Sequence, residues 1–304
     1  MRILSSLLLV SSQSLTIQRL ANTVRMASAQ HRFVDIGANL LDARFTEGSY
    51  HGKVRHEPDF DLVLQRAAGV GMRHMVLTAG TLEESREAVR RVRELRISNQ
   101  TDCQLYCTVG VHPTRCMEFE EAESADENLE ELLALVKDGM SDGVVASVGE
   151  IGLDYDRLEF CPKDVQRKHF VRQLRLSEET GLPLFLHNRN VGDELYDLLV
   201  EHKEKWKAGV VHSFDGTAEL AKKFIDLGLY VGLNGCSLKT QENLEVVKTL
   251  PLDKILLETD CPYCDVRRTH AGFDFVSTHF ECKQEKKFEK GLQVKVRFNI
   301  LDGS

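Results

Sequence analysis

The segment VVASVGE, residues 144–150, is an apolar run that leads into an acidic residue, Glu150. Three later segments have the same arrangement: LFLH (184–187), VVH (210–212) and ILLETD (255–260). Short continuous apolar runs are typical of buried parallel strands. Because parallel strands of a closed barrel all end at one face, we expect the polar residues that follow these runs to meet there.

The four polar residues at these positions are Glu150, His187, His212 and Asp260. Two imidazoles and two carboxylates form a mixed nitrogen and oxygen donor set that suits a divalent metal ion. A glutamate after a buried strand is costly unless it is paired or metal-bound. The alternatives are a salt bridge at the rim for Glu150 and ordinary core packing for each histidine. The repetition of the pattern favours metal ligation and predicts a metal-dependent hydrolase.

The rest of the chain repeats a strand–helix alternation. Expected strands are 33–39, 75–79, 105–111, 144–149, 184–187, 210–212, 229–233 and 255–259. Signals for helices lie between them. Thr81 begins a capping-box pattern, and Pro162 and Gly181 mark the start and end of another helix. Asp193 and Thr217 are each expected to begin a further helix. Eight such units predict a (β/α)8 barrel of the TIM type. A doubly wound open sheet is the alternative, but no glycine-rich nucleotide loop follows the first strand.

Composition and charge limit the classes of function that the chain can have. The chain has 304 residues, 42% of them hydrophobic and 28% charged, with a net charge of −8. This net negative charge argues against a surface that binds nucleic acid through overall electrostatic attraction. Metal ions bound in an acidic pocket can still supply positive charge locally. No apolar stretch approaches the roughly 20 residues of a membrane span, so no membrane partner is expected.

The two ends differ from the middle. Residues 1–32 contain four arginines and no acidic residue. This composition resembles a mitochondrial transit peptide, whereas a disordered leader or a start at Met26 is the alternative. The barrel domain is expected over residues 33–262. Residues 263–304 form an irregular tail in which the last outer helix of the barrel is expected to be missing.

Eight scattered cysteines do not suggest a disulfide framework in a chain of this size. Reduced thiols indicate a nuclear or cytoplasmic protein, or a mitochondrial one if the leader is a targeting segment. The C-x-x-C pair Cys261 and Cys264 allows a second class of function, thiol redox chemistry. It comes late in the chain, with little sequence left to build a redox fold around it.

Other polar residues near strand ends add to the expected site. His112, after the third strand, is a candidate for phosphate binding or proton transfer. Arg189 is a candidate phosphate clamp because its planar guanidinium suits that anion. Asp35 and Asn39 on the first strand are weaker metal-ligand candidates, and Asp154 is a candidate support for the ligands. Glycines beside Glu150 are expected to let metal and substrate approach the backbone.

These residues resemble the TatD family of metal-dependent deoxyribonucleases, and the animal members in particular. The matching stretches are residues 33–40, 110–113, 149–154, 186–189, 212–217 and 258–260, with closer likeness at 155–164, 234–240 and 269–272. The resemblance extends from Phe33 to about His270 and implies a barrel with two divalent cations, Mg²⁺ or Mn²⁺, with Zn²⁺ as an alternative. It implies that Glu150 bridges both ions and that His187, His212 and Asp260 are further ligands.

Two departures from that family pattern concern the first strand and the end of the chain, and a third is Asn188, where relatives often have a cysteine after the histidine of the fifth strand. Many relatives carry a His-x-His pair on the first strand, where this sequence has Asp35 and Gly37. Relatives also continue through an Arg-Asn-Glu-Pro stretch into a final helix, whereas this chain has the sequence VRFNIL at 296–301. The second departure raises the alternative of a truncated isoform with little or no catalysis.

The expected reaction is hydrolysis of DNA phosphodiester bonds, with trimming from the 3′ end. The expected catalytic residues are Asp260, Glu150 and His112, while Arg189 and His112 hold the phosphate. The expected partner is single-stranded DNA or a strand end, and no oligomeric state is assigned. A fourth class, hydrolysis of amide or lactone bonds on the same metal core, remains open because barrels support many chemistries.

Overall fold

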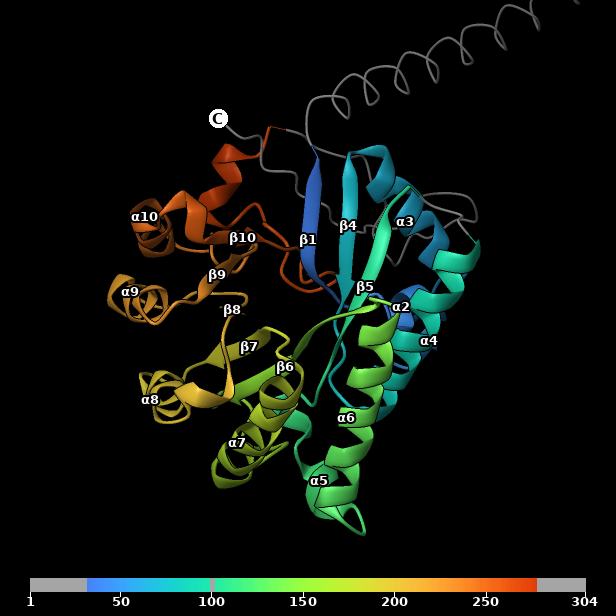
Figure 1. Ribbon diagram of the computed structural model, residues 1–304. Helices are drawn as coiled ribbons and strands as arrows, with labels where there is room; N and C mark the ends of the chain where they lie inside the picture. Colours follow the sequence, from blue (N-terminus) through green and yellow to red (C-terminus); the bar gives the residue numbers. More distant parts are fainter. Residues whose placement is uncertain (1–31, 99–101, 278–304) are drawn as a thin grey trace, which may run out of the picture.

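Eight parallel strands form a ring in the computed structural model, which describes residues 32–98 and 102–277 (Figure 1). Neighbouring strands follow the order β1-β4-β5-β6-β7-β8-β9-β10. Their bounds are β1 Phe33–Ala38, β4 Met72–Leu77, β5 Gln104–Val109, β6 Val145–Asp154, β7 Leu184–Arg189, β8 Gly209–Val211, β9 Tyr230–Leu233 and β10 Ile255–Leu257. The predicted barrel is confirmed, and the open doubly wound sheet is wrong because the strand order never reverses.

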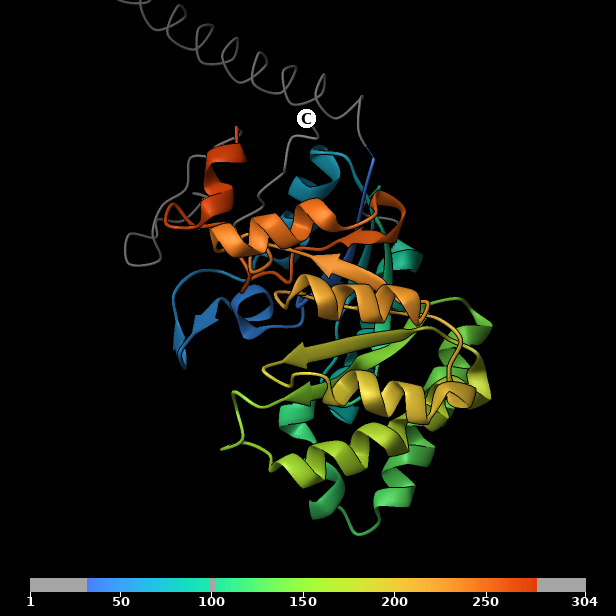
Figure 2. The ribbon, with the colours of Figure 1, turned by 90° about the vertical axis from the view of Figure 1, so that its left-hand side faces the viewer.

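Helices connect the strands and cover the outside of the barrel (Figures 1 and 2). They are α2 Ala43–Thr46, α3 Phe60–Gly69, α4 Leu82–Ser98, α5 Met117–Glu121, α6 Ala125–Ser141, α7 Lys163–Thr180, α8 Glu194–Glu201, α9 Ala218–Asp226 and α10 Gln241–Thr249, with short 3-10 turns η1 Pro113–Arg115, η2 Lys203–Lys205, η3 Leu252–Lys254 and η4 Ala271–Phe275. A small antiparallel hairpin, β2 Ser49–Tyr50 with β3 Lys53–Val54, precedes α3. In the part of the chain that the structure describes, no helix combines the length and apolar character that crossing a membrane requires.

The helix boundaries follow the signals in the sequence. The Thr217 side chain accepts a hydrogen bond from the Leu220 amide at the start of α9. Gly181 ends α7 with φ of 71°, the left-handed conformation that glycine adopts without strain. At the start of α4, only one of the two hydrogen bonds of the predicted capping box forms. Thr81 accepts from the Glu84 amide, but the Glu84 carboxylate accepts from Gly80 instead of closing the box on Thr81.

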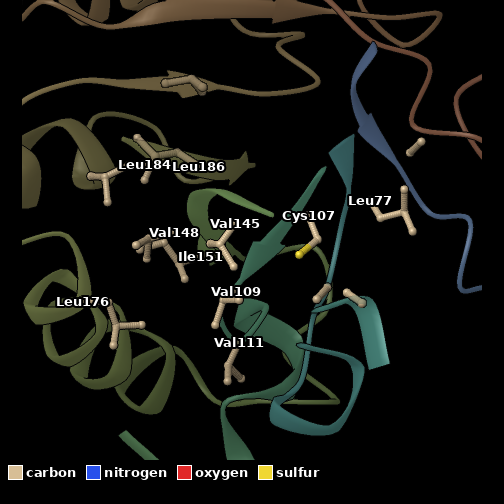
Figure 3. Close-up of a cluster of buried hydrophobic side chains, with 14 of the residues drawn as sticks. Leu77, Cys107, Val109, Val111, Val145, Val148, Ile151, Leu176, Leu184 and Leu186 are labelled. Atoms are coloured by element: carbon tan, nitrogen blue, oxygen red, sulfur yellow. The ribbon is translucent and has the colours of Figure 1, made fainter. Parts of the chain in front are cut away.

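Strands β6 to β9 bury most of their side chains on both faces. Figure 3 shows part of this core, where Val109, Val148 and Ile151 of β5 and β6 pack near Leu186 of β7 and Leu176 of α7. All five side chains are fully shielded from solvent. Burial on both faces explains why the strands were recognisable as continuous apolar runs rather than as alternating patterns.

Strand β6 is longer than predicted, because it continues through Glu150 to Asp154. Its pairing with β7 shifts register between Val148 and Ile151, and the Glu150 amide donates to Ala79 instead. A side chain on Gly149 would place its Cβ 2.5 Å from the Phe185 carbonyl oxygen. Glycine here therefore allows β6 and β7 to approach each other, which differs from the expected role of leaving room for metal and substrate.

The ring closes between β1 and the residues that follow β10. The Asp260 amide donates to the Gly37 carbonyl at 2.8 Å, and the Asn39 amide donates to the Cys261 carbonyl at 2.9 Å. The buried Asp35 carboxylate accepts from the Thr259 hydroxyl at 2.6 Å and from the Thr259 amide at 3.0 Å. We name this region, residues 35–39 with 259–261, the closing seam.

No α-helix covers the outside of the closing seam between residues 261 and 277. That segment contains only η4, and there Val266 and Val276 pack on Leu238 and on Leu244 of α10 in a small second cluster. Val34 of β1 and Leu257 of β10 are each about half exposed (48% and 47%). The predicted leader up to residue 31 and the tail from residue 278 lie outside the described residues.

Replacing Asp35 with asparagine (Asp35→Asn) should change how stability depends on pH. Burial raises the pKa of Asp35 to about 7, although hydrogen bonds from Thr259 and Gly37 act in the opposite direction. An unfolded aspartate titrates near 3.8, so the folded state holds an extra proton between these values. Stability from this group is therefore lost as the pH rises through that window.

The asparagine amide does not titrate, so we expect the variant to gain stability relative to the natural chain as the pH rises. The gain should reach roughly 1–4 kcal/mol between about pH 4 and about pH 8. Urea unfolding of both chains in the presence of a metal chelator measures this difference. A difference that stays constant across the pH range would contradict a buried, protonated Asp35.

Candidate metal centre

One carboxylate oxygen, Oε1 of Glu150, is the point on which three histidines converge. His187 Nδ1 lies 2.6 Å from it, His212 Nε2 lies 2.7 Å from it, and His112 Nε2 lies 3.3 Å from it. The facing nitrogens of His187 and His212 are 3.2 Å apart. Four side chains that are far apart in the sequence therefore form one cluster inside the barrel.

The strands position this cluster by their parallel register. Glu150 lies within β6, His187 lies within β7, and His212 directly follows β8. His112 precedes η1, three residues after the end of β5. Four adjacent strands thus deliver one side chain each toward the carboxyl-terminal half of the barrel, where chemistry is concentrated in this fold.

Each histidine has a polar group close to its other nitrogen. His187 Nε2 lies 3.3 Å from Asp154 Oδ2, and His112 Nδ1 lies 2.7 Å from the Thr114 hydroxyl. His212 Nδ1 lies 3.4 Å from Glu258 Oε2. A carboxylate behind a histidine fixes the orientation of the ring and increases its basicity, as occurs behind metal-bound histidines.

The charges of the cluster are strongly coupled. Burial acts to raise the pKa of Glu150, but His212 and His112 outweigh it and hold that pKa well below its usual range. Burial acts to lower the pKa of His212, yet Glu150 and Glu258 raise it well above the ordinary value. Burial prevails at His112, whose pKa is lowered. The pKa of His187 is raised against burial by Asp154 and Glu150.

The donor set fits a divalent cation better than it fits hydrogen bonding alone. A carboxylate oxygen offers about two acceptor positions, fewer than the three imidazole nitrogens that face Glu150 Oε1. Tetrahedral ligands at about 2.0–2.1 Å from a metal are about 3.3 Å from one another, close to the His187–His212 and His112–Glu150 separations of 3.2 and 3.3 Å. His112, Glu150 and His187 have ligand atoms mutually close enough to share an ion.

His112 is itself part of the cluster. The sequence suggested a phosphate-binding or proton-transfer role, whereas the structure puts its Nε2 in the group of atoms that could hold a metal. Its lowered pKa keeps the ring neutral, which is the form that binds metal ions.

Asp260 lies beside the cluster and makes no hydrogen bond to its histidines within the described residues. Its Oδ1 accepts from Asn39 Nδ2 at 2.7 Å, and its Oδ2 accepts from the Cys264 thiol at 3.0 Å. Burial raises its pKa to about 6, while nearby His212 lowers it. Asn39 in turn accepts from the Thr78 hydroxyl at 2.7 Å, so Asn39 positions the carboxylate of Asp260.

The first strand contributes little to the cluster. Both oxygens of Asp35 are engaged by Thr259, and one also accepts from the Gly37 amide at 3.1 Å. A Cβ on Gly37 would lie 2.8 Å from Glu258 Oε2 and 2.8 Å from the Phe185 ring. A side chain at position 37 would thus require its neighbours to move.

Arg189 ends β7 on the same face as the cluster. It is partly exposed and forms no ion pair with any residue of the described ranges. Burial raises the pKa of Asp215 even though the charge of Arg189 acts to lower it. The pKa of Asp154 is lowered against burial, chiefly by His187 with a smaller contribution from Arg189. Among the described residues, no ion-pair partner therefore competes with an anion for this guanidinium.

The structure adds Glu258 to the candidate site, a residue that the sequence pattern did not single out. It is buried, accepts from the Ser213 amide, and lies 3.3 Å from Asn234 Nδ2. The signal was present, because Glu258 is the first polar residue after the apolar run at 255–257. Asp260, two residues later, is also acidic, so the sequence pattern alone does not distinguish the two carboxylates.

Replacing Glu258 with glutamine (Glu258→Gln) should weaken metal binding, because His212 loses the carboxylate behind its ring. Loss of such an outer partner typically costs about 10–100-fold in metal affinity, and we expect a loss in that range. Titration of the metal-free protein with Mn²⁺ measures it. Glu245→Gln, an exposed change on α10, is the matched control, and equal affinities in the two variants would contradict the orienting role.

A barrel with a histidine–carboxylate centre at the carboxyl ends of its strands defines a metal-dependent hydrolase. The model of the family described as TatD related DNase matches residues 34–290, which is most of the chain. The chain therefore belongs to the TatD family, and the resemblance found in the sequence is confirmed.

Individual relatives agree with this assignment. A Schizosaccharomyces pombe protein named Deoxyribonuclease Tat-D is 44% identical over 88% of this chain and 84% of its own length. A Shigella flexneri protein named 3'-5' ssDNA/RNA exonuclease TatD is 32% identical over 75% of this chain and 78% of its own. A solved TatD family hydrolase from Entamoeba histolytica superposes with a TM-score of 0.80 at 36% identity, covering 88% of this chain and 87% of that one.

Proposed function

We propose that this protein hydrolyses phosphodiester bonds of DNA with one divalent cation and removes nucleotides from the 3′ ends of single strands. The observation that carries the proposal is the convergence of three imidazoles on Glu150 Oε1 at the carboxyl face of the barrel. The relatives named as deoxyribonuclease and as 3'-5' ssDNA/RNA exonuclease support the choice of substrate.

Glu150, His187, His212 and His112 would hold the cation, which supplies Lewis-acid polarisation of a phosphoryl oxygen and acidifies a bound water. Asp260 accepts the proton of the attacking water. With a pKa raised to about 6 by burial, its carboxylate is ionised at neutral pH and still basic enough for this role. Arg189 binds the phosphate that flanks the scissile bond, because its guanidinium has no competing carboxylate partner in the described chain.

Strand ends suit this site better than a long duplex. A protein with a net charge of −8 repels an extended polyanion, and Arg189 offers only a local contact for one phosphate. Tyr263 follows Asp260 by three residues in the chain and is about half exposed (49%). Exposed aromatic rings stack on unpaired bases, which are available only in single strands.

Oligonucleotides labelled at either end test the proposal. With a divalent metal ion present, we expect a 3′ label to be released first as mononucleotide and a 5′ label to remain on progressively shorter products. Single strands should be degraded faster than blunt duplexes. Turnover of small amides or lactones without cleavage of DNA would overturn the proposal. A protein that binds metal ions but cleaves neither substrate would favour the non-catalytic alternative.

Metal stoichiometry is a separate prediction. We expect one tightly bound divalent cation per chain, in place of the two that the family resemblance implied, because Asp35 and Asn39 are committed to the closing seam. Elemental analysis after dialysis measures the content. A thermal melt should show stabilisation by about 2.7 kcal/mol when the free cation is at 100 times its dissociation constant. Two tightly bound ions per chain would contradict the single-cation site.

A further inference from the structure

Two cysteines from different loops lie in contact beside Asp260. Cys236 follows β9, Cys264 follows β10, and their Sγ atoms are 3.0 Å apart. The described residues contain seven free cysteines, of which only Cys236 and Cys264 are not buried. These two thiols are therefore adjacent to each other, and both residues are partly exposed.

The backbone holds the two loops together independently of the thiols. The Gly235 amide donates to the Cys264 carbonyl at 3.1 Å. A Cβ on Gly235 would lie 2.3 Å from that same carbonyl oxygen, so only glycine permits this approach. A disulfide has a sulfur–sulfur bond of about 2.05 Å, and closing the present gap requires a shift of only about 1 Å.

The C-x-x-C spacing in the sequence suggested a different pair. Cys261 is buried, and its amide donates to the Thr259 hydroxyl at 3.2 Å as part of the closing seam. The neighbour of Cys264 is Cys236, which is 28 positions away in the chain. The redox interpretation based on Cys261 and Cys264 as a pair is therefore wrong in its choice of partner.

We propose that Cys236 and Cys264 form a reversible disulfide when the protein meets a peroxide, and that this bond lowers nuclease turnover. One thiol sulfur attacks the oxygen–oxygen bond of hydrogen peroxide, which gives a sulfenic acid and one water. The second sulfur displaces the hydroxyl of the sulfenic acid, and a second water leaves with the thiol proton. Two thiols and one peroxide thus become one disulfide and two waters.

The contact with Asp260 explains the effect on turnover. In the reduced protein the Cys236 thiol donates to Cys264 Sγ, and the Cys264 thiol donates to Asp260 Oδ2 at 3.0 Å. A disulfide has no hydrogen to donate, so Asp260 loses this bond. The link also ties Cys236 to the loop that carries Asp260, close to Asn234, which contacts Glu258.

The test combines a chemical and a kinetic measurement on the full chain. The protein is treated with hydrogen peroxide, remaining thiols are alkylated, and peptides are mapped by mass spectrometry before and after dithiothreitol. We expect a linked peptide pair containing residues 236 and 264 that dithiothreitol separates. Turnover on labelled DNA should fall about tenfold or more with the link and return on reduction.

Two variants make the outcome decisive. Cys236→Ser should keep basal turnover, form no link, and resist inhibition by peroxide. Cys282→Ser should behave like the natural chain, which excludes that cysteine as the partner. Failure to find the 236–264 link under peroxide overturns the proposal whether or not the protein cleaves DNA, because the peptide map does not depend on activity. A complete link with unchanged turnover overturns its regulatory part.

Discussion

Replacing Glu150 with glutamine (Glu150→Gln) is expected to reduce turnover on DNA by at least about 1,000-fold, because metal catalysis contributes several kcal/mol and each 1.36 kcal/mol is a factor of ten. The substitution keeps the shape of the side chain but removes the charge on which His187, His212 and His112 converge. Release of 3′-labelled nucleotides at saturating Mn²⁺ measures the loss.

We expect the Glu150→Gln variant to fold but to be inactive. Circular dichroism of the metal-free protein should match that of the natural chain, whereas the stabilisation by Mn²⁺ should disappear. Glu201→Gln is the matched control, since Glu201 is an exposed residue at the end of α8. Full activity in Glu150→Gln would refute the assignment of the metal centre.

Replacing His212 with alanine (His212→Ala) should have the second-largest effect. His212 is buried, faces Glu150 with Nε2, and its ring stacks on Phe185 at a centroid distance of 4.7 Å. Since loss of an outer partner alone costs about 10–100-fold in affinity, loss of the ligand itself should weaken metal binding by more than about 100-fold. Turnover at fixed Mn²⁺ should fall in parallel.

Rescue distinguishes ligation from a packing role. The variant leaves a ring-sized space against Phe185, so added free imidazole should restore part of the metal affinity. His202 lies before the start of β8, whereas His212 follows its end. The control variant His202→Ala should therefore leave metal binding unchanged. A variant that unfolds without metal, or that binds Mn²⁺ normally, would contradict the role of His212 as a ligand.

The strands and three of the site residues could be predicted because the information is local. Glu150, His187 and His212 each follow an apolar run, and parallel strands bring such residues to one end of the barrel. The local pattern also has a limit. It placed the end of β6 at Gly149, whereas the register shift against β7 carries the strand on to Asp154.

Contacts between distant segments were beyond the sequence pattern. Asp35 was a weak ligand candidate, but its partner is Thr259, 224 positions later. Nothing in either segment alone reveals that pairing. The same holds for Cys264, whose true neighbour, Cys236, comes from a different loop. The C-x-x-C spacing therefore could not predict which cysteine is the neighbour of Cys264, because the packing of two loops decides it.

The closing seam has a consequence for how the protein is made. Its two halves, residues 35–39 and 259–261, are synthesised near the beginning and near the end of the barrel. More than 200 residues are therefore synthesised after Asp35 and Asn39 before their hydrogen-bond partners, Thr259 and Asp260, are added to the chain. Asp260 reaches its place only when the barrel closes, so a nascent chain whose histidines have already come together still lacks the residue that we propose as the proton acceptor. Nuclease activity would thus be withheld until translation of the barrel is complete.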